Sequence, residues 1–350
     1  MAFFKKFFNN AIKDRKSDDD TVTVKEKPKP KYYGTVSPYP NFKASQDAQV
    51  LQSAIKSHDV DEDVIISVLV MRSNEQRQKI KAVYEATTGE PLVKALKSSL
   101  RGDLEDVTLA LLMTPPQLDA YCIRKATKGV LQRLGTDEDV LVEILATRSK
   151  EQIQEIANVF KHEYGRSLEE VLKSEARGDF EKALLALYHA NRDTSTEVDM
   201  NLAHKDAEIL FEAGENRSGT QVDTFIEILT TRSAAQLSKT FQRYACVSDL
   251  SLPKALQAEL KGDIEDCLVD IVKVCWNTPA FFAEKLHAAM DGHGTCEASL
   301  IRVLVSRSEV DLKKIVEEYH AMYNRYLQED IVRDTDGHYQ KVLLGLCGPT

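Results

Sequence analysis

Apolar side chains along most of the chain recur at helical spacing, and strand signals are scarce. From about residue 45 this pattern repeats, because four similar apolar runs each end at an Arg-Ser pair. The runs read IISVLVM, LVEILAT, FIEILTT and LIRVLVS, at residues 65–71, 141–147, 225–231 and 300–306. The pattern predicts an all-α protein of four repeats.

The Arg-Ser pairs set the length of the repeat. Their arginines are Arg72, Arg148, Arg232 and Arg307, and a glycine follows each after 30 positions. A unit of roughly 70 residues holds four or five helices of mean length, about 11 residues. The arginines are 76, 84 and 75 positions apart, and the longer middle interval matches the polar segment 191–204. We therefore expect two consecutive pairs of repeats with a connector between them.

These intervals give a division of the whole chain. The predicted parts are a tail at 1–44, repeats at 45–115, 116–191, 206–278 and 279–350, and a connector at 192–205. In the tail, four phenylalanines fall on one side of residues 1–13, which predicts an amphipathic helix. Its apolar face could enter a groove on a partner, the protein's own core or a membrane surface. The Pro- and Lys-rich residues 25–31 are typical of a linker.

Each repeat also has a loop position and a distant position at fixed counts from its arginine. Twelve residues before the arginines stand Val60, Thr136, Thr220 and Thr295, and 39 residues further on stand Ser99, Glu175, Glu259 and Asp334. A glycine precedes each threonine, whereas Asp59 precedes Val60. The three repeats with Gly-Thr therefore have the distant acid, and the repeat without Gly-Thr lacks it.

Each feature alone has an ordinary explanation. The threonine would be a helix N-cap, followed at 137–139 by acids that complement the helix dipole. The acid would lie on a solvated helix face. Neither explanation accounts for their joint retention and joint loss, which are expected if loop and acid form one site.

The residue types indicate which ligand such a site would take. Glycine-rich loops expose backbone carbonyls, and a carboxylate adds further hard oxygen ligands, which Ca²⁺ prefers. One acid per site predicts weak affinity for the bare ion, with positions left for water or for a ligand's oxygens. Residues 59–63 lack the glycine and the glutamate of an EF-hand loop.

Composition narrows the possible functions. The chain has 43% hydrophobic and 29% charged residues, as soluble globular proteins do. Its net charge of −9 argues against nucleic acid, and against adhesion to anionic lipid unless a positive group bridges the two. The six cysteines form no CxxC pair and are expected to be reduced thiols of a cytoplasmic protein. No apolar run approaches the ~20 residues of a membrane span.

The combined motif, Leu-x-x-Ala, Gly-x-Gly-Thr, Arg-Ser and Gly-Asp-[Phe/Ile]-Glu, recurs over residues 45–350 and resembles the annexin core. Residues 36–42 and the C-terminal Leu-Cys-Gly are most similar to the lipocortin type of that family. The resemblance implies five helices per repeat, a curved disc of four repeats and several calcium ions bound on the convex face. It also implies reversible, calcium-triggered attachment to acidic phospholipid membranes.

The resemblance assigns metal ligands by position. They are Met290, Gly292, Gly294 and Asp334 in the fourth repeat, Gly214, Arg217, Gly219 and Glu259 in the third, Gly129, Gly135, Thr136 and Glu175 in the second, and Asp59, Val60, Glu62, Lys97, Leu100 and Glu105 in the first. In the second repeat the loop carries four additional residues, Val130–Arg133. We expect this insertion to weaken or abolish the second site.

The resemblance further implies roles in vesicle aggregation, membrane trafficking or repair, exocytosis, and regulation of phospholipase and inflammation. Residues 1–13 resemble the segment that such proteins offer to small dimeric EF-hand sensors of the calgizzarin type. We expect a cytoplasmic, peripherally membrane-bound protein, with unconventional secretion as a further possibility. One alternative is a calcium-independent helical scaffold that presents residues 1–13 to a protein. An enzyme is not expected, because the chain lacks HExxH, GxSxG and Walker motifs.

Overall fold

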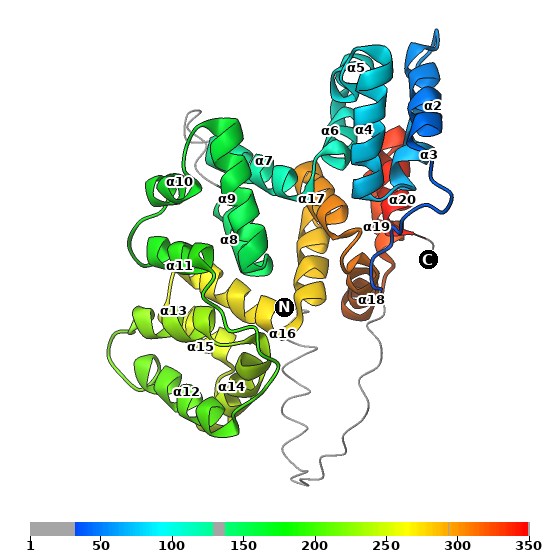
Figure 1. Ribbon diagram of the computed structural model, residues 1–350. Coiled ribbons are helices and arrows are strands. Elements are labelled where there is room, and N and C mark those ends of the chain that lie inside the picture. The colour runs from blue at the N-terminus through cyan, green and yellow to red at the C-terminus, as the bar shows by residue number, and fades with distance from the viewer. Residues whose placement is uncertain (1–31, 129–136, 293, 349–350) are drawn as a thin grey trace. The chain divides into compact units, whose positions relative to one another are not determined.

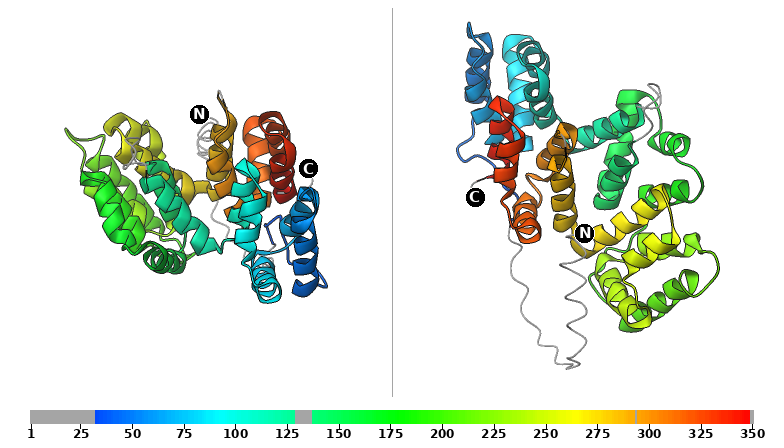
Figure 2. Two further views of the ribbon diagram at one scale, coloured as in Figure 1. Left: turned by 90° about the horizontal axis from the view of Figure 1, so that it is seen from above. Right: turned by 180° about the vertical axis from the view of Figure 1, so that it is seen from behind.

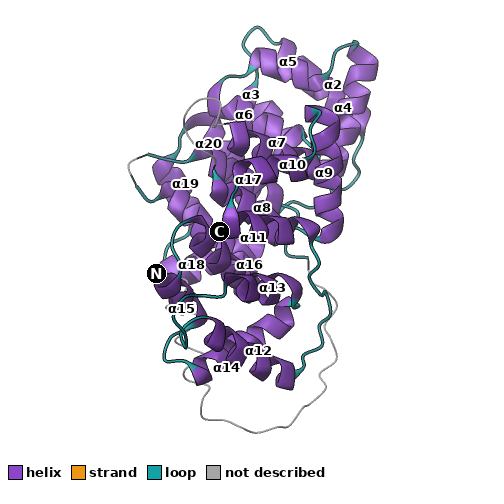
Figure 3. Cartoon of the chain, turned by 90° about the vertical axis from the view of Figure 1, so that its left-hand side faces the viewer, coloured by secondary structure: helices purple, strands orange, loops and turns teal. Residues whose placement is uncertain are grey.

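The computed structural model describes residues 32–128, 137–292 and 294–348, and these residues form helices joined by loops (Figures 1 and 3). The first two repeats contain α2 (Ala44–Lys56), α3 (Glu62–Val70), α4 (Asn74–Thr88), α5 (Leu92–Ser99), α6 (Gly102–Leu112), α7 (Pro115–Lys128), α8 (Glu138–Thr147), α9 (Lys150–Tyr164), α10 (Leu168–Glu175) and α11 (Gly178–His189). The last two contain α12 (Met200–Ala213), α13 (Val222–Thr231), α14 (Ala234–Val247), α15 (Leu252–Glu259), α16 (Asp263–Met290), α17 (Glu297–Arg307), α18 (Leu312–Tyr323), α19 (Leu327–Asp334) and α20 (Gly337–Cys347). No strand occurs within these described ranges, as the helical spacing predicted.

Five helices per repeat account for all of these elements, because α16 contains the last helix of the third repeat and the first of the fourth. Its backbone leaves the helical region at Asn277, where φ is −158° and ψ is 92°. Pro279 lies just beyond this break, and proline disfavours helical geometry in the preceding residues. The prediction of about five helices per repeat is confirmed.

The Arg-Ser pairs mark helix starts. Ser73 and Ser149 accept hydrogen bonds from the N–H groups of Gln76 and Gln152, whose side chains bond back to the serine backbone. These reciprocal bonds begin α4 and α9. Ser233 likewise accepts from the Gln236 N–H at the start of α14.

The arginines of the same pairs hold three repeats together through buried ion pairs. Arg72 Nε and Nη2 donate to Asp47 at 2.6 and 2.9 Å. The same two-bond fork joins Arg148 to Asp119 and Arg232 to Asp206. The acids lie on α2, α7 and α12, so each fork ties the first helix of a repeat to the end of its second.

In the fourth repeat the arginine forms its two-bond ion pair with a different acid. Phe282 stands on α16 where the other repeats place the aspartate, and the Arg307 guanidinium lies 4.5 Å from the centre of its ring. Arg307 instead donates to both oxygens of Asp311, each at 2.7 Å. Asp311 occupies the place of the glutamine that caps the third helix in the other repeats. The fourth repeat therefore lacks this glutamine at the start of its third helix.

The chain divides into two compact units, one of which is Asp119–Phe281 with the second and third repeats. A hydrophobic cluster runs continuously through this unit from Ala120 to Val272. The connector is bonded to the third repeat, since Arg192 donates to the carbonyls of Leu229 and Arg232. Lys182 of α11 also pairs with Asp223 of α13 at 2.9 Å.

The other unit joins the first repeat, up to Leu118, with the fourth, from Phe282 onward. Helix α20 packs against α3 and α6, and Lys341 pairs with Asp63 at 2.6 Å. Within this unit the blue α2 lies beside the cyan α4 (Figure 2). Residues 32–43 bind both repeats: the Thr35 N–H donates to the Ser308 carbonyl, and the Tyr39 N–H donates to the Gln76 side chain.

The expected pairing of consecutive repeats is therefore wrong. The units combine the second repeat with the third and the first with the fourth. The physical reason lies in the connector, whose polar residues bond to the ends of α13 and so attach the third repeat to the second. A polar segment between apolar runs predicts a boundary, whereas this segment is hydrogen-bonded to the third repeat. The predicted helix at 1–13 lies outside the described residues.

Candidate functional site

Each repeat closes the loop between its first two helices with the same backbone hydrogen bond. The residue that starts the second helix donates its N–H to an alanine carbonyl near the end of the first helix. The bonds run from Asp61 to Ala54 (3.1 Å), Asp137 to Ala126 (3.1 Å), Gln221 to Ala213 (2.8 Å) and Cys296 to Ala289 (2.8 Å). All four loops therefore leave and re-enter the helices in the same way.

The bonded residues are 7 positions apart in the first and fourth repeats, 8 in the third and 11 in the second. The second loop thus carries its four additional residues between ends that are held like those of the other loops. Gly129, Val130–Arg133, Gly135 and Thr136 lie outside the described residues. Glu175, the second repeat's distant acid, is half-buried at the end of α10.

The third loop brings its threonine to the distant acid. Thr220 Oγ1 donates to Glu259 Oε2 at 3.1 Å, across 39 positions of sequence. Glu259 is exposed at the end of α15. Gly219 has a φ of 82°, a left-handed conformation that glycine adopts without strain. Loop and acid therefore meet.

The other two ligands predicted for the third site lie in the same loop. Gly214 ends α12 and is buried, and a Cβ there would lie 3.1 Å from the Phe225 ring. The Arg217 N–H donates to the Gly214 carbonyl at 3.2 Å, which narrows the loop between them. Arg217 itself is exposed.

The fourth loop approaches its distant residue through the backbone. Thr295 Oγ1 donates to the main-chain carbonyl of Asp334 at 3.1 Å, in place of the carboxylate contact seen in the third repeat. Gly294 is left-handed, with a φ of 104°, Gly292 is exposed, and Met290 is buried at the end of α16. The predicted ligands are thus gathered at one loop and one helix end.

The threonines are not the helix caps that the ordinary explanation required. The N-cap residues of α8, α13 and α17 are Asp137, Gln221 and Cys296, each one position after the threonine. Thr220 and Thr295 instead donate their hydroxyls to the end of a distant helix. The helix-cap interpretation is wrong for these two repeats. This result favours the interpretation in which loop and acid form one site.

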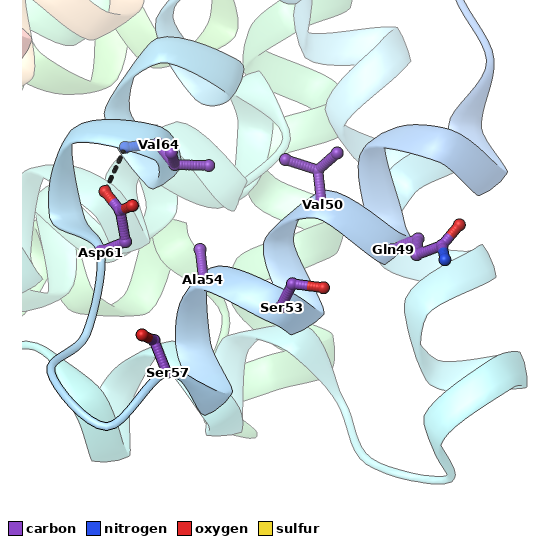
Figure 4. A pocket seen from close by; sticks show the side chains of 7 residues that line it. All are labelled: Gln49, Val50, Ser53, Ala54, Ser57, Asp61 and Val64. Atoms are coloured by element: carbon purple, nitrogen blue, oxygen red, sulfur yellow. Dashed lines mark hydrogen bonds between the residues drawn. The ribbon is translucent and has the colours of Figure 1, made fainter.

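The first repeat has no such contact. Ser99, at the position of the acid, donates its hydroxyl to the Ala95 carbonyl of its own helix at 2.9 Å. Asp59 is fully exposed and lies 3.5 Å from His58. Val60 and Glu62 are partly buried beside Asp61, whose carboxylate caps α3 at the Val64 N–H. A shallow hollow between α2 and α3 adjoins this loop (Figure 4).

Two of the secondary ligands predicted in the first repeat, Lys97 and Leu100, have carbonyls that already accept hydrogen bonds from an arginine. The Arg101 guanidinium donates to the carbonyls of Lys97, Ser98 and Leu100, at 3.4, 3.0 and 2.6 Å. These carbonyls end α5, where a positive group complements the helix dipole. Glu105 begins the next helix and is partly buried. A cation here would have to replace Arg101.

The donor chemistry fits calcium in the third and fourth repeats. Each site combines a glycine loop, a carboxylate at a helix end and a threonine hydroxyl that bonds to that helix end. These groups offer only hard oxygen ligands. Across the described ranges, no three His, Cys, Asp or Glu side chains gather as a side-chain metal centre would need. The candidate sites would therefore use one carboxylate and several backbone oxygens each.

Comparisons with known proteins agree with this arrangement. The Annexin family model matches residues 46–111, 119–187, 205–271 and 281–346. Annexin A1 of Cavia cutleri is 48% identical over 348 residues, which cover 99% of each chain. Annexin A1 of Homo sapiens is 46% identical over the same length and share.

Solved structures give the same result. A structure of annexin III is 44% identical, with a TM-score of 0.88 over 91% of this chain and 98% of that one. A calcium-bound structure of annexin (Sm)1 is 30% identical, with a TM-score of 0.80 over 91% of this chain and 93% of that one. With four matched repeats and relatives near half identity over the full length, the chain belongs to the annexin family.

Proposed function

We propose that this protein attaches reversibly to membranes that carry acidic phospholipids, through calcium held between its loops and the lipid phosphoryl oxygens. Annexins as a family bind calcium and membrane phospholipids, and a relative with 30% identity has been solved with calcium bound. The observation that carries the proposal is the contact between Thr220 and Glu259, together with the loss of both partners in the first repeat. Calcium would supply a positive bridge between a protein of net charge −9 and an anionic surface.

The third and fourth loops would carry most of the attachment. In the third, Thr220 holds Glu259 toward the loop of Gly214, Arg217 and Gly219. In the fourth, Thr295 holds the end of α19 against the loop of Met290, Gly292 and Gly294. The second site would be weakened by its longer loop. The first repeat would contribute only two weak calcium sites, one at Asp59, Val60 and Glu62 and the other at Lys97, Leu100 and Glu105.

Several finer roles belong to the same proposal. They are vesicle aggregation, membrane trafficking or repair, exocytosis, and regulation of phospholipase and inflammation, without enzymatic activity of the protein's own. Residues 1–13 would bind a dimeric EF-hand sensor by their apolar face. The protein would lie in the cytoplasm and move to plasma or vesicle membranes when calcium rises, with unconventional secretion as a further route. Within the described residues, no helix is long and apolar enough to cross a membrane.

Cosedimentation with vesicles tests the proposal against a calcium-independent scaffold and against an enzyme. The protein is mixed with phosphatidylserine–phosphatidylcholine vesicles in calcium, and the pellet is then washed with chelator. We expect pelleting in calcium and release by chelator, with no pelleting on phosphatidylcholine alone. Binding that survives chelation, or that never occurs, would contradict the proposal.

A further inference from the structure

The carboxylate of Asp334 is bonded to the arginine that precedes it. Arg333 Nε donates to Asp334 Oδ1 at 2.9 Å, and the Asp334 side chain is only 14% exposed. In the third repeat the corresponding acid, Glu259, accepts from the neutral hydroxyl of Thr220. The two best-preserved candidate sites therefore differ in what holds their acid.

Arg333 is fixed in this position by a second, fully buried carboxylate. Its Nη1 donates to Asp330 Oδ1 at 2.8 Å, and the Asp330 side chain has no exposed surface. The other oxygen, Asp330 Oδ2, accepts from the Tyr319 hydroxyl at 2.5 Å, and Arg325 contacts Oδ1 at 2.5 Å. A buried carboxylate with these partners is a rigid anchor. The guanidinium therefore bridges a fixed acid and the candidate calcium ligand.

This arrangement is confined to the fourth repeat. The residues one position before the distant site are Ser98, Ser174 and Ala258 in the other repeats. None of these side chains carries a charge, so none can compete with a cation for the acids Glu175 and Glu259. The arginine fork suits such competition, because it can hold two carboxylates at once.

We propose that Arg333 is a built-in counter-ion that competes with calcium for Asp334 and sets the fourth site to a lower affinity than its ligands alone would give. The inference rests on the proposed function and deepens it. Calcium that takes both oxygens of Asp334 must displace the Arg333 Nε–H from Oδ1, while Asp330 keeps the guanidinium close by. The third loop, which has no such competitor, fills at lower calcium than the fourth.

A nuclear magnetic resonance titration of the full chain with calcium tests this at each loop separately. The backbone amide of Gly294 reports the fourth loop and that of Gly219 reports the third. In Arg333→Gln we expect half-saturation at Gly294 to need about two- to fivefold less calcium, which is the range of a partly exposed ion pair. Half-saturation at Gly219 should stay unchanged.

Arg325→Gln is the matched control. It removes the same charge and a contact with the same Asp330, whereas the contact with Asp334 is made by Arg333. A shift at Gly294 that is absent, or equal in the two variants, would overturn the inference. Arg333→Lys keeps a positively charged partner for Asp330, so it tests the inference even if Arg333→Gln fails to fold. In Arg333→Lys the calcium needed for half-saturation at Gly294 should fall, by less than in Arg333→Gln. If neither glycine of the parent responds to calcium, the proposed function fails, and the inference falls with it.

Discussion

Replacing Asp119 by alanine is expected to destabilise the unit of the second and third repeats, because it leaves a buried guanidinium without its partner. Arg148 Nε and Nη2 donate to Asp119, both at 2.8 Å, and the two side chains are 5% and 6% exposed. Burial alone would lower the pKa of Arg148, but the charge and hydrogen bonds of Asp119 raise it. The pair therefore stabilises the charged form.

The magnitude follows from the two hydrogen bonds. Each charge-assisted bond contributes about 1.5–3 kcal/mol, and breaking one side of a buried pair costs about 3–5 kcal/mol in measured cases. We therefore expect Asp119→Ala to lower the free energy of unfolding by about 4 kcal/mol. Arg148→Met combined with Asp119→Ala should recover most of this loss, because the buried guanidinium is removed together with the carboxylate.

Urea unfolding followed by tryptophan fluorescence measures the loss. The only tryptophan, Trp276, lies in the same unit and stacks on Phe241 with ring centres 6.1 Å apart. The midpoint should fall in Asp119→Ala and return toward the parent value in the double variant. A single variant that loses less than about 1 kcal/mol, or a double variant as unstable as the single, would refute the reasoning.

Three further predictions follow from the loops and the packing. Deleting Val130–Arg133 should add a calcium ion to the binding stoichiometry measured by calorimetry; unchanged stoichiometry and affinity would show that the insertion does not impair the second site. Asp311→Ala should cost about 3 kcal/mol in urea unfolding, because the 9% exposed Arg307 side chain loses its only fork, and a neutral result would mean that the Phe282 ring suffices. Asp266 is exposed, yet partial desolvation and then the charges of Glu265 and neighbouring acids raise its pKa, so the folded chain holds that proton more tightly than the unfolded chain and ionisation costs stability. Asp266→Asn should therefore raise the melting temperature at pH 7, and this gain should shrink as the pH falls through the ordinary carboxyl range and vanish below it; a gain that is undiminished at about pH 3 would exclude this cause.

The sequence predicted the repeats and the loop–acid partners well, because both depend on counting. A fixed interval of 39 residues separates Thr220 from Glu259, and one repeat lost both features, so no structure was needed to connect them. The structure adds which oxygen accepts each threonine hydrogen bond. Thr220 reaches a carboxylate, whereas Thr295 reaches a main-chain carbonyl, and spacing alone does not distinguish the two.

Other features depend on contacts between distant segments and were missed. The polar residues of the connector predict a boundary and give no sign that Arg192 bonds to the end of α13. The aspartates that pair with the repeat arginines were visible at equal places in three first helices, with Phe282 in the fourth, but their role required the buried geometry. Arg333 is adjacent to Asp334 in sequence, yet its anchoring by Asp330 appears only once α19 is folded.

The most direct test of the central claim compares the calcium needed for vesicle binding in the parent and in Glu259→Gln combined with Asp334→Asn. Both substitutions preserve size and remove one negative charge from each of the two best-formed candidate sites. Phosphatidylserine vesicles are titrated with calcium, and the concentration for half-maximal cosedimentation is recorded. We expect the double variant to need at least about tenfold more calcium, because each carboxylate supplies the only charged ligand of its site. Equal calcium requirements in the two proteins would contradict the account.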